Sequence, residues 1–167
     1  MQIRKNLIWL SVVSVLFLSG CFWKGTDKTA DQKLYLVNVL DTDFFEDCHI
    51  PGSLNISMMD IKKVAQDWPK DATIVFYCSN YSCQASPQCC KMLKKMGFTH
   101  TLDYEAGIAG WYQAHLQDPQ GYPIIGACKQ PYLTMENRPF DDQAPEGVEI
   151  ITTEELRSLL EQYQEKA

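Results

Sequence analysis

Two short runs of almost continuous apolar and β-branched residues constrain the fold of this chain more than any other feature. Residues 34–40 and 73–77 each have the length of one strand, and neither alternates between apolar and polar side chains. Such runs are typical of strands that are covered on both faces in a parallel sheet. Between them, apolar side chains over residues 59–68 recur with helical spacing. The pattern therefore predicts a β-α-β unit.

The next part of the chain continues this alternation. Ser86 and Pro87 are residue types preferred at the N-cap and first position of a helix, which we expect to end at Gly97. A short strand over residues 99–104 and a helical segment over residues 108–115 follow. Strands that alternate with helices predict the α/β class with a mainly parallel sheet.

The composition is that of one globular domain rather than a coiled coil or a disordered chain. Of the 167 residues, 46% are hydrophobic and 22% are charged. The formal net charge of −6 leaves no basic surface for phosphates, so we expect no nucleic-acid partner. The cysteine count of 7 is odd, so the thiols need separate explanations.

Residues 1–20 have the features of a targeting segment. A basic start precedes an apolar stretch that is too short to span a bilayer well by itself. The segment ends in Leu-Ser-Gly before Cys21, which resembles the lipobox of bacterial lipoproteins. This resemblance implies a signal peptide over residues 1–20, lipidation of Cys21 by acyl chains such as palmitate, and a polar tether over residues 21–33. The alternatives are a signal-anchor helix or an ordinary secretory signal beside an incidental cysteine.

We therefore expect the protein to be lipid-anchored to a membrane of the cell envelope. Phe22, rather than an aspartate, follows Cys21, which favours the outer membrane facing the periplasm if the source is Gram-negative. The six thiols that remain after the anchor would then lie in an oxidising compartment.

Cys78 directly follows the second apolar run, at the carboxyl end of a predicted parallel strand. Reactive groups in such sheets lie at this edge, where the next helix supplies N–H donors and the positive end of its dipole. These groups lower the pKa of a thiol and favour the nucleophilic thiolate. Cys78 is therefore a candidate nucleophile, although an inert buried cysteine fits the position equally well.

Several motifs resemble the rhodanese family, in the order usual for that family. They are His49 to Ile56, Val75 to Cys78, Ser86, Gly97-Phe98, and Tyr104 to Trp111. The resemblance covers residues 34–126 and implies a domain of about five mainly parallel strands with helices on both faces. It also implies that Cys78 accepts a sulfane sulfur as a persulfide and passes it to a thiophilic acceptor.

The loop after Cys78 departs from the family pattern because it holds no Arg or Lys. The predicted substrate-binding residues are all neutral: Ser79, Asn80, Tyr81, Ser82, Cys83 and Ser86. A dianion such as thiosulfate would depend on N–H groups, hydroxyls and a helix dipole, which bind it more weakly than a cation would. Gln84 stands where a cysteine phosphatase or arsenate reductase needs arginine, which argues against those activities.

The other thiols have different predicted roles. Cys83 is either a resolving thiol for a persulfide or sulfenate on the nucleophile, or a structural residue at the helix entrance. Cys89 and Cys90 are expected to fill the core between helix and sheet. Cys48 and Cys128 stay unassigned, because sequence does not fix disulfide connectivity. No spacing of Cys and His predicts a metal site, and no cofactor is expected.

The C-terminal part has two sections. Residues 127–147 are rich in polar residues and proline and are expected to form a surface loop or linker. The pattern of residues 148–167 predicts a strand followed by an amphipathic helix. Thr152 and Glu155 form a capping box at the start of this helix. Rhodanese-like domains usually open with a strand and a helix that have no counterpart before residue 34. We expect residues 148–167 to pack on the domain and replace that element, as in a circular permutation.

These features together predict a membrane-anchored, rhodanese-like sulfurtransferase in which Cys78 carries the persulfide. Its expected partners are a sulfur donor, a thiol or cyanide-like acceptor, and the membrane. One alternative is a catalytically weak rhodanese-like module that binds a partner at the envelope. Another is a redox protein in which Cys78 and Cys83 cycle between dithiol and disulfide.

Overall fold

The computed structural model describes residues 33–139 and 146–164. The predicted signal peptide, Cys21 and most of the predicted tether lie outside this part of the chain. Within it, no helix is long and apolar enough to cross a membrane.

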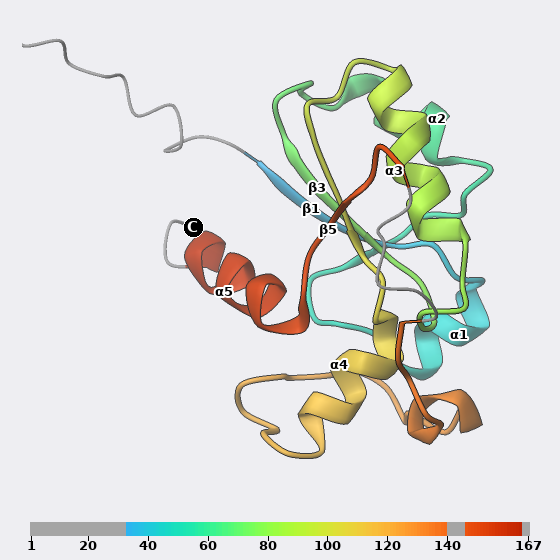
Figure 1. Cartoon of the computed structure of the whole chain (residues 1–167), viewed down its shortest axis with the longest axis vertical. Helices are drawn as coiled ribbons and strands as arrows, with labels where there is room; N and C mark the ends of the chain where they lie inside the picture. The colour runs from blue at the N-terminus through green and yellow to red at the C-terminus, as the bar shows by residue number, and fades with distance from the viewer. Residues whose placement is uncertain (1–32, 140–145, 165–167) are drawn as a thin grey trace, which may run out of the picture.

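Five parallel strands form one sheet in the order β2-β1-β3-β4-β5 (Figure 1). The α/β class and the five-stranded parallel sheet predicted from the sequence are confirmed. The strands span Leu34–Asn38 (β1), Leu54–Asn55 (β2), Thr73–Tyr77 (β3), His100–Tyr104 (β4) and Glu149–Ile150 (β5).

Helices cover both faces of the sheet, with α2 and α3 on one side and α4 and α5 on the other (Figure 1). The helices span Thr42–Asp47 (α1), Ile61–Val64 (α2), Ala85–Lys95 (α3), Gly107–His115 (α4) and Thr153–Gln164 (α5). Short 3₁₀ turns in the described part of the chain span Ala65–Asp67 (η2) and Pro131–Thr134 (η3).

The central strand β3 is buried at every position, which explains its continuous apolar run. Val75 and Tyr77 belong to the core that α4 and α5 cover, together with Trp111 and Leu156. The alternate side chains of β3 belong to the core under α3. Because successive side chains of a strand point to opposite faces, a strand between two cores needs an apolar residue at each position.

Two predicted boundaries differ from the structure. The prediction that Ser86 caps α3 was wrong, because the helix begins at Ala85 and Gln84 is its N-cap residue. Ser86 and Pro87 lie inside the first turn, where a proline is tolerated because its missing N–H would have no helical partner. The helix expected over residues 59–68 is shorter and consists of α2 followed by η2.

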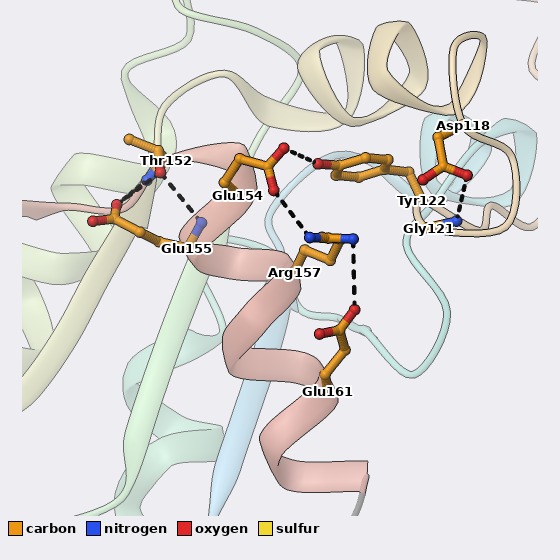
Figure 2. Close-up of polar contacts among 8 residues, drawn as sticks. All are labelled: Asp118, Gly121, Tyr122, Thr152, Glu154, Glu155, Arg157 and Glu161. Carbon is orange, nitrogen blue, oxygen red and sulfur yellow. Dashed lines mark hydrogen bonds and ion pairs between the residues drawn. The ribbon is translucent and has the colours of Figure 1, made fainter.

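The C-terminal strand and helix complete the sheet on the side of β4. Strand β5 pairs in parallel with β4, so that Asp103 lies opposite Ile150. The capping box of α5 is formed, since the Thr152 N–H donates to Glu155 Oε2 at 2.8 Å and the Glu155 N–H donates to Thr152 Oγ1 at 3.3 Å (Figure 2). Leu156 is fully buried against the sheet. The tail thus packs on the sheet and forms its edge next to β4.

Candidate active site

Cys78 lies directly after β3, at the carboxyl end of the central strand, and is almost fully buried. A disulfide joins it to Cys83, with a Cα–Cα distance of 6.2 Å. That distance is within the range that disulfides prefer. The two cysteines begin and nearly end the loop of residues 78–84 that connects β3 to α3, named here the reactive loop. The two sulfur atoms are therefore as close as the resolving-thiol alternative for Cys83 requires.

The reactive loop rests on the first turn of α4. The Ile108 N–H donates to the carbonyl oxygen of Cys78, and the Ala109 N–H donates to that of Ser79, both at 2.9 Å. Gly107 allows this approach, because a Cβ there would lie 2.6 Å from the Cys78 oxygen and its φ is +59°. The first N–H groups of α4 are thus paired with the start of the loop.

Three N–H groups of the loop are paired away from the Cys78 sulfur. The Ser82 N–H donates to Asn80 Oδ1 at 3.1 Å, and the Cys83 N–H donates to the Asn80 carbonyl oxygen at 3.0 Å. The Tyr81 N–H donates to Asn137 Oδ1 at 3.3 Å. In this disulfide-bonded form, these three N–H groups are therefore not available to bind an anion at the Cys78 sulfur, although the sequence predicts that role for the amides of the loop.

The side chains of the predicted loop residues point in different directions. The Ser79 hydroxyl lies 4.0 Å from the Cys78 sulfur. Tyr81 packs against the core under α4 and α5, whereas Cys83 packs against the core under α3. Ser86 is buried within the first turn of α3. The structure thus brings Ser79 and Cys83 to the nucleophile and distributes the other residues around the loop.

The charge near the reactive loop is negative. The loop itself has no Arg or Lys. Burial raises the pKa of Tyr81, and the nearby Glu105 carboxylate raises it further. Burial also raises the pKa of Glu105. An anionic sulfur donor would thus meet no basic side chain on the loop and one acidic side chain beside it.

Asp103 is a buried acid that the sequence analysis did not select. It lies in β4, is fully buried, and neither carboxylate oxygen has a hydrogen-bond partner among the described residues. Burial is the main reason that its pKa is raised to about 7, and the charge of Glu105 raises this pKa further. The nearby Ser86 hydroxyl lowers the pKa, but its geometry is too poor for a regular hydrogen bond. An acidic residue inside a predicted strand was the signal that could have identified it.

The four remaining described thiols have structural positions. Cys89 and Cys90 are free and fully buried in the core under α3, which confirms their predicted packing role. Burial raises the pKa of Cys89 to about 12 and that of Cys90 further. Cys48 and Cys128, which the sequence left unassigned, form a second disulfide.

A cavity of about 500 Å³ lies between α4 and the start of α5, and Tyr81 and Asn137 contribute to its wall. On its other side, Glu154 accepts a hydrogen bond from the Tyr122 hydroxyl at 2.6 Å and pairs with Arg157 at 3.3 Å (Figure 2). Cys78 and Cys83 do not line this cavity. The cavity therefore touches the reactive loop at Tyr81 and not at the two sulfur atoms.

No group of three or more His, Cys, Asp or Glu side chains within residues 33–139 and 146–164 could hold a metal ion.

Comparisons with known proteins give the same family as the sequence motifs. The family described as "Rhodanese-like domain" matches residues 22–114. "Putative sulfurtransferase YtwF" from Bacillus subtilis (strain 168) is 34% identical over 82 residues, which are 49% of this chain and 77% of that protein. "Putative sulfur carrier protein YrkF" from the same organism is 26% identical over 82 residues, which are 43% of its own length.

Among solved structures, the BH2092 protein from Bacillus halodurans has the same fold. It is 20% identical, with a TM-score of 0.50, and the alignment covers 60% of this chain and 69% of that one. The family match extends over more than half of the chain and includes β1 to β4 and the whole reactive loop. The chain belongs to the rhodanese-like domain family.

Proposed function

We propose that this protein is a sulfurtransferase in which Cys78 carries the transferred sulfur as a persulfide. The observation that carries the proposal is the position of Cys78 at the carboxyl end of the central strand, at the head of a loop that leads into α3. This position lies within the region that matches the family. The name of the relative YtwF supports the same activity.

The reaction needs the Cys78 thiolate, so the disulfide with Cys83 must first be opened. Two equivalents of an external thiol would reduce it to two thiols and become a disulfide themselves. The Cys78 thiolate then attacks the sulfane sulfur of a donor, and the rest of the donor leaves with the electron pair of the broken S–S bond. An acceptor such as cyanide or a thiolate attacks the outer sulfur of the persulfide and restores the Cys78 thiolate.

The charge around the loop favours a polysulfide or persulfide donor over thiosulfate. Thiosulfate is a compact dianion, and the reactive loop offers it no cationic side chain. Glu105, an acidic side chain, lies close enough to Tyr81 to raise the pKa of that phenol. A donor whose charge is lower or more distant from the attacked sulfur meets less repulsion.

Mass spectrometry of the intact, reduced protein tests this function. We expect incubation with polysulfide to add about 32 Da, one sulfur atom, and cyanide to remove it as thiocyanate. Cys78→Ser should abolish the adduct, whereas Cys83→Ser should retain it. If neither polysulfide nor thiosulfate gives an adduct on Cys78, the proposal is wrong, and the rhodanese-like binding module becomes the better explanation.

A second candidate function is thiol–disulfide exchange by Cys78 and Cys83. The disulfide between them favours it, because both oxidation states of a redox pair must be accessible. Catalysed reduction of a disulfide substrate that needs both cysteines, without any persulfide on Cys78, would distinguish this function from sulfur transfer.

We also propose that the protein is anchored to a cell-envelope membrane through Cys21. The proposal rests on the lipobox-like sequence and on the preceding apolar segment. Labelling of growing cells with an alkyne analogue of palmitate should mark the protein, and Cys21→Ala should lose the label. A labelled Cys21→Ala variant would contradict this assignment.

A further inference from the structure

A strap formed by residues 124–139 extends from the C-terminal end of α1 to the reactive loop (Figure 1). The family match ends at residue 114, so the strap lies beyond it. Its contacts with the loop are therefore not explained by membership of the family alone.

The first half of the strap is fixed to the end of α1. The Cys48–Cys128 disulfide joins the two segments, and the Cys128 N–H donates to the Asp47 carbonyl oxygen at 2.8 Å. The Asp47 carboxylate accepts hydrogen bonds from the N–H groups of Lys129 and Gln130 at 3.0–3.1 Å. A covalent bond and several hydrogen bonds thus hold this end.

The second half of the strap is fixed to α4. The Gln113 side-chain amide donates to the carbonyl oxygens of Leu133 and Met135 at 3.1 and 2.8 Å. The Leu133 side chain is fully buried in the core under α4 and α5. These contacts leave the strap little freedom just before Asn137.

Asn137 bridges two segments that surround the nucleophile. Its Oδ1 accepts the Tyr81 N–H at 3.3 Å, in the middle of the reactive loop. Its Nδ2 donates to the carbonyl oxygen of Ala106 at 2.9 Å, directly before α4. The carbonyl oxygens of Cys78 and Ser79 are already bound to the N–H groups of α4. Asn137 therefore connects the middle of the reactive loop to the start of α4, the segment that also binds the beginning of the loop.

We propose that Asn137 is a positioning residue that holds the reactive loop in the conformation in which Cys83 faces Cys78. This inference rests on the proposed function. Fixing the Tyr81 N–H reduces the conformations open to the loop between the two cysteines, and so raises the effective concentration of the Cys83 thiolate at Cys78. It also keeps the Tyr81 N–H away from an anion bound at Cys78.

The consequence is that the strap affects which of two reactions a persulfide on Cys78 undergoes: release of its outer sulfur or transfer of that sulfur to an acceptor. When the Cys83 thiolate attacks Cys78 Sγ, a bond forms between the two cysteine sulfurs and the bond from Sγ to the outer sulfur breaks. The outer sulfur leaves with the electron pair and, with the proton of the persulfide or one from water, becomes hydrosulfide. The step needs no external oxidant. When an external acceptor attacks the outer sulfur first, the sulfur is transferred instead. A tightly held loop favours hydrosulfide release over transfer.

Two measurements on the full chain test the role of Asn137. The first is the equilibrium of the Cys78–Cys83 pair with a dithiothreitol redox buffer, read by intact mass after alkylation. The second is the ratio of hydrosulfide released to thiocyanate formed when the polysulfide-loaded protein is given cyanide. Asn137→Ala loses two hydrogen bonds, of which the one to the Tyr81 N–H acts on the loop directly. We expect it to shift the equilibrium about fivefold toward the dithiol and to lower the ratio by a similar factor, the size expected for that one bond.

Matched variants separate this role from a general loss of stability. Glu136→Ala removes the neighbouring exposed side chain, which pairs with the exposed Arg138, and should leave both measurements at the wild-type values. Asn137→Asp keeps an oxygen for the Tyr81 N–H but loses the donor to the Ala106 carbonyl oxygen, so it should recover only part of the redox equilibrium. A purely structural role would change the free energy of unfolding without moving the equilibrium.

The failure of this inference can be told apart from the failure of the proposed function. If Asn137→Ala has the wild-type equilibrium and the wild-type ratio while Cys78 still forms a persulfide, the positioning role is wrong and sulfur transfer stands. If the wild-type protein forms no persulfide, sulfur transfer is wrong. In that case, an unchanged redox equilibrium in Asn137→Ala would also overturn the positioning role.

Discussion

Cys48 and Cys128 lie 80 residues apart in the chain, and a disulfide joins them with a Cα–Cα distance of 4.7 Å. In the loop-entropy treatment, closing a loop of that length lowers the conformational entropy of the unfolded chain enough to stabilise the fold by about 4.5 kcal/mol, whereas closing the short Cys78–Cys83 loop gives about 2 kcal/mol. We therefore expect Cys48→Ala/Cys128→Ala to lose more unfolding free energy than Cys78→Ala/Cys83→Ala. Urea unfolding of both double variants without reductant measures the difference. Equal losses would contradict the loop-length argument.

The buried thiols should be unreactive in the folded protein. Burial raises the pKa of Cys89 to about 12, so the reactive thiolate is scarce at pH 8. We expect iodoacetamide to leave Cys89 and Cys90 unmodified in native protein at pH 8 and to modify both in urea, as read by peptide mapping. Rapid native alkylation of either residue would show that α3 opens readily.

Asp103 should make the protein less stable as pH rises. Its pKa is about 7 in the folded protein, against 3.8 for an ordinary aspartate, so the folded state binds the proton more tightly. The destabilisation is absent below about pH 4, grows between about pH 4 and 7, and is complete above that, with an upper limit of about 4 kcal/mol. Asp103→Asn should remove this slope in urea unfolding. Asp67→Asn, at an exposed site, is the control and should retain it.

Gly107→Ala should disturb the contact between α4 and the reactive loop. The new Cβ would lie 2.6 Å from the Cys78 carbonyl oxygen, at a φ of +59°. We expect a loss of about 2 kcal/mol or more of unfolding free energy and a shift of the Cys78–Cys83 redox equilibrium. Gly147→Ala has a similar φ of +75° but no atom within 4 Å, so it isolates the cost of the conformation. Equal effects of the two variants would show that the close approach costs nothing.

The sheet could be predicted from the sequence because its central strands are buried on both faces. The runs at residues 34–40 and 73–77 coincide with β1 and β3, and residues 148–151 contain β5. The short strand β2 and the helix α1 were not predicted. Neither has an apolar pattern of its own: β2 has two residues, and α1 contains no buried side chain. Such elements depend on their neighbours rather than on local periodicity.

The position of the candidate nucleophile was also accessible from the sequence, because Cys78 follows a strand directly. The pairing of Cys48 with Cys128 was not, because it joins segments that only the folded chain brings together. Asn137 was missed for a similar reason. It stands in a polar stretch without periodicity, and its role depends on Tyr81, 56 residues earlier in the chain. A contact of that kind leaves no local signal in one sequence.

The position of β5 has a consequence for synthesis of the protein. This strand is made after every other strand of the sheet, yet it pairs with β4. Until β5 has left the ribosome, β4 is an unpaired edge strand whose backbone N–H and C=O groups can pair with other strands. The last contacts to form also have large sequence separation from the rest of the sheet, and such contacts slow folding. The growing chain thus leaves this edge of the sheet open until the final strand and helix have been made.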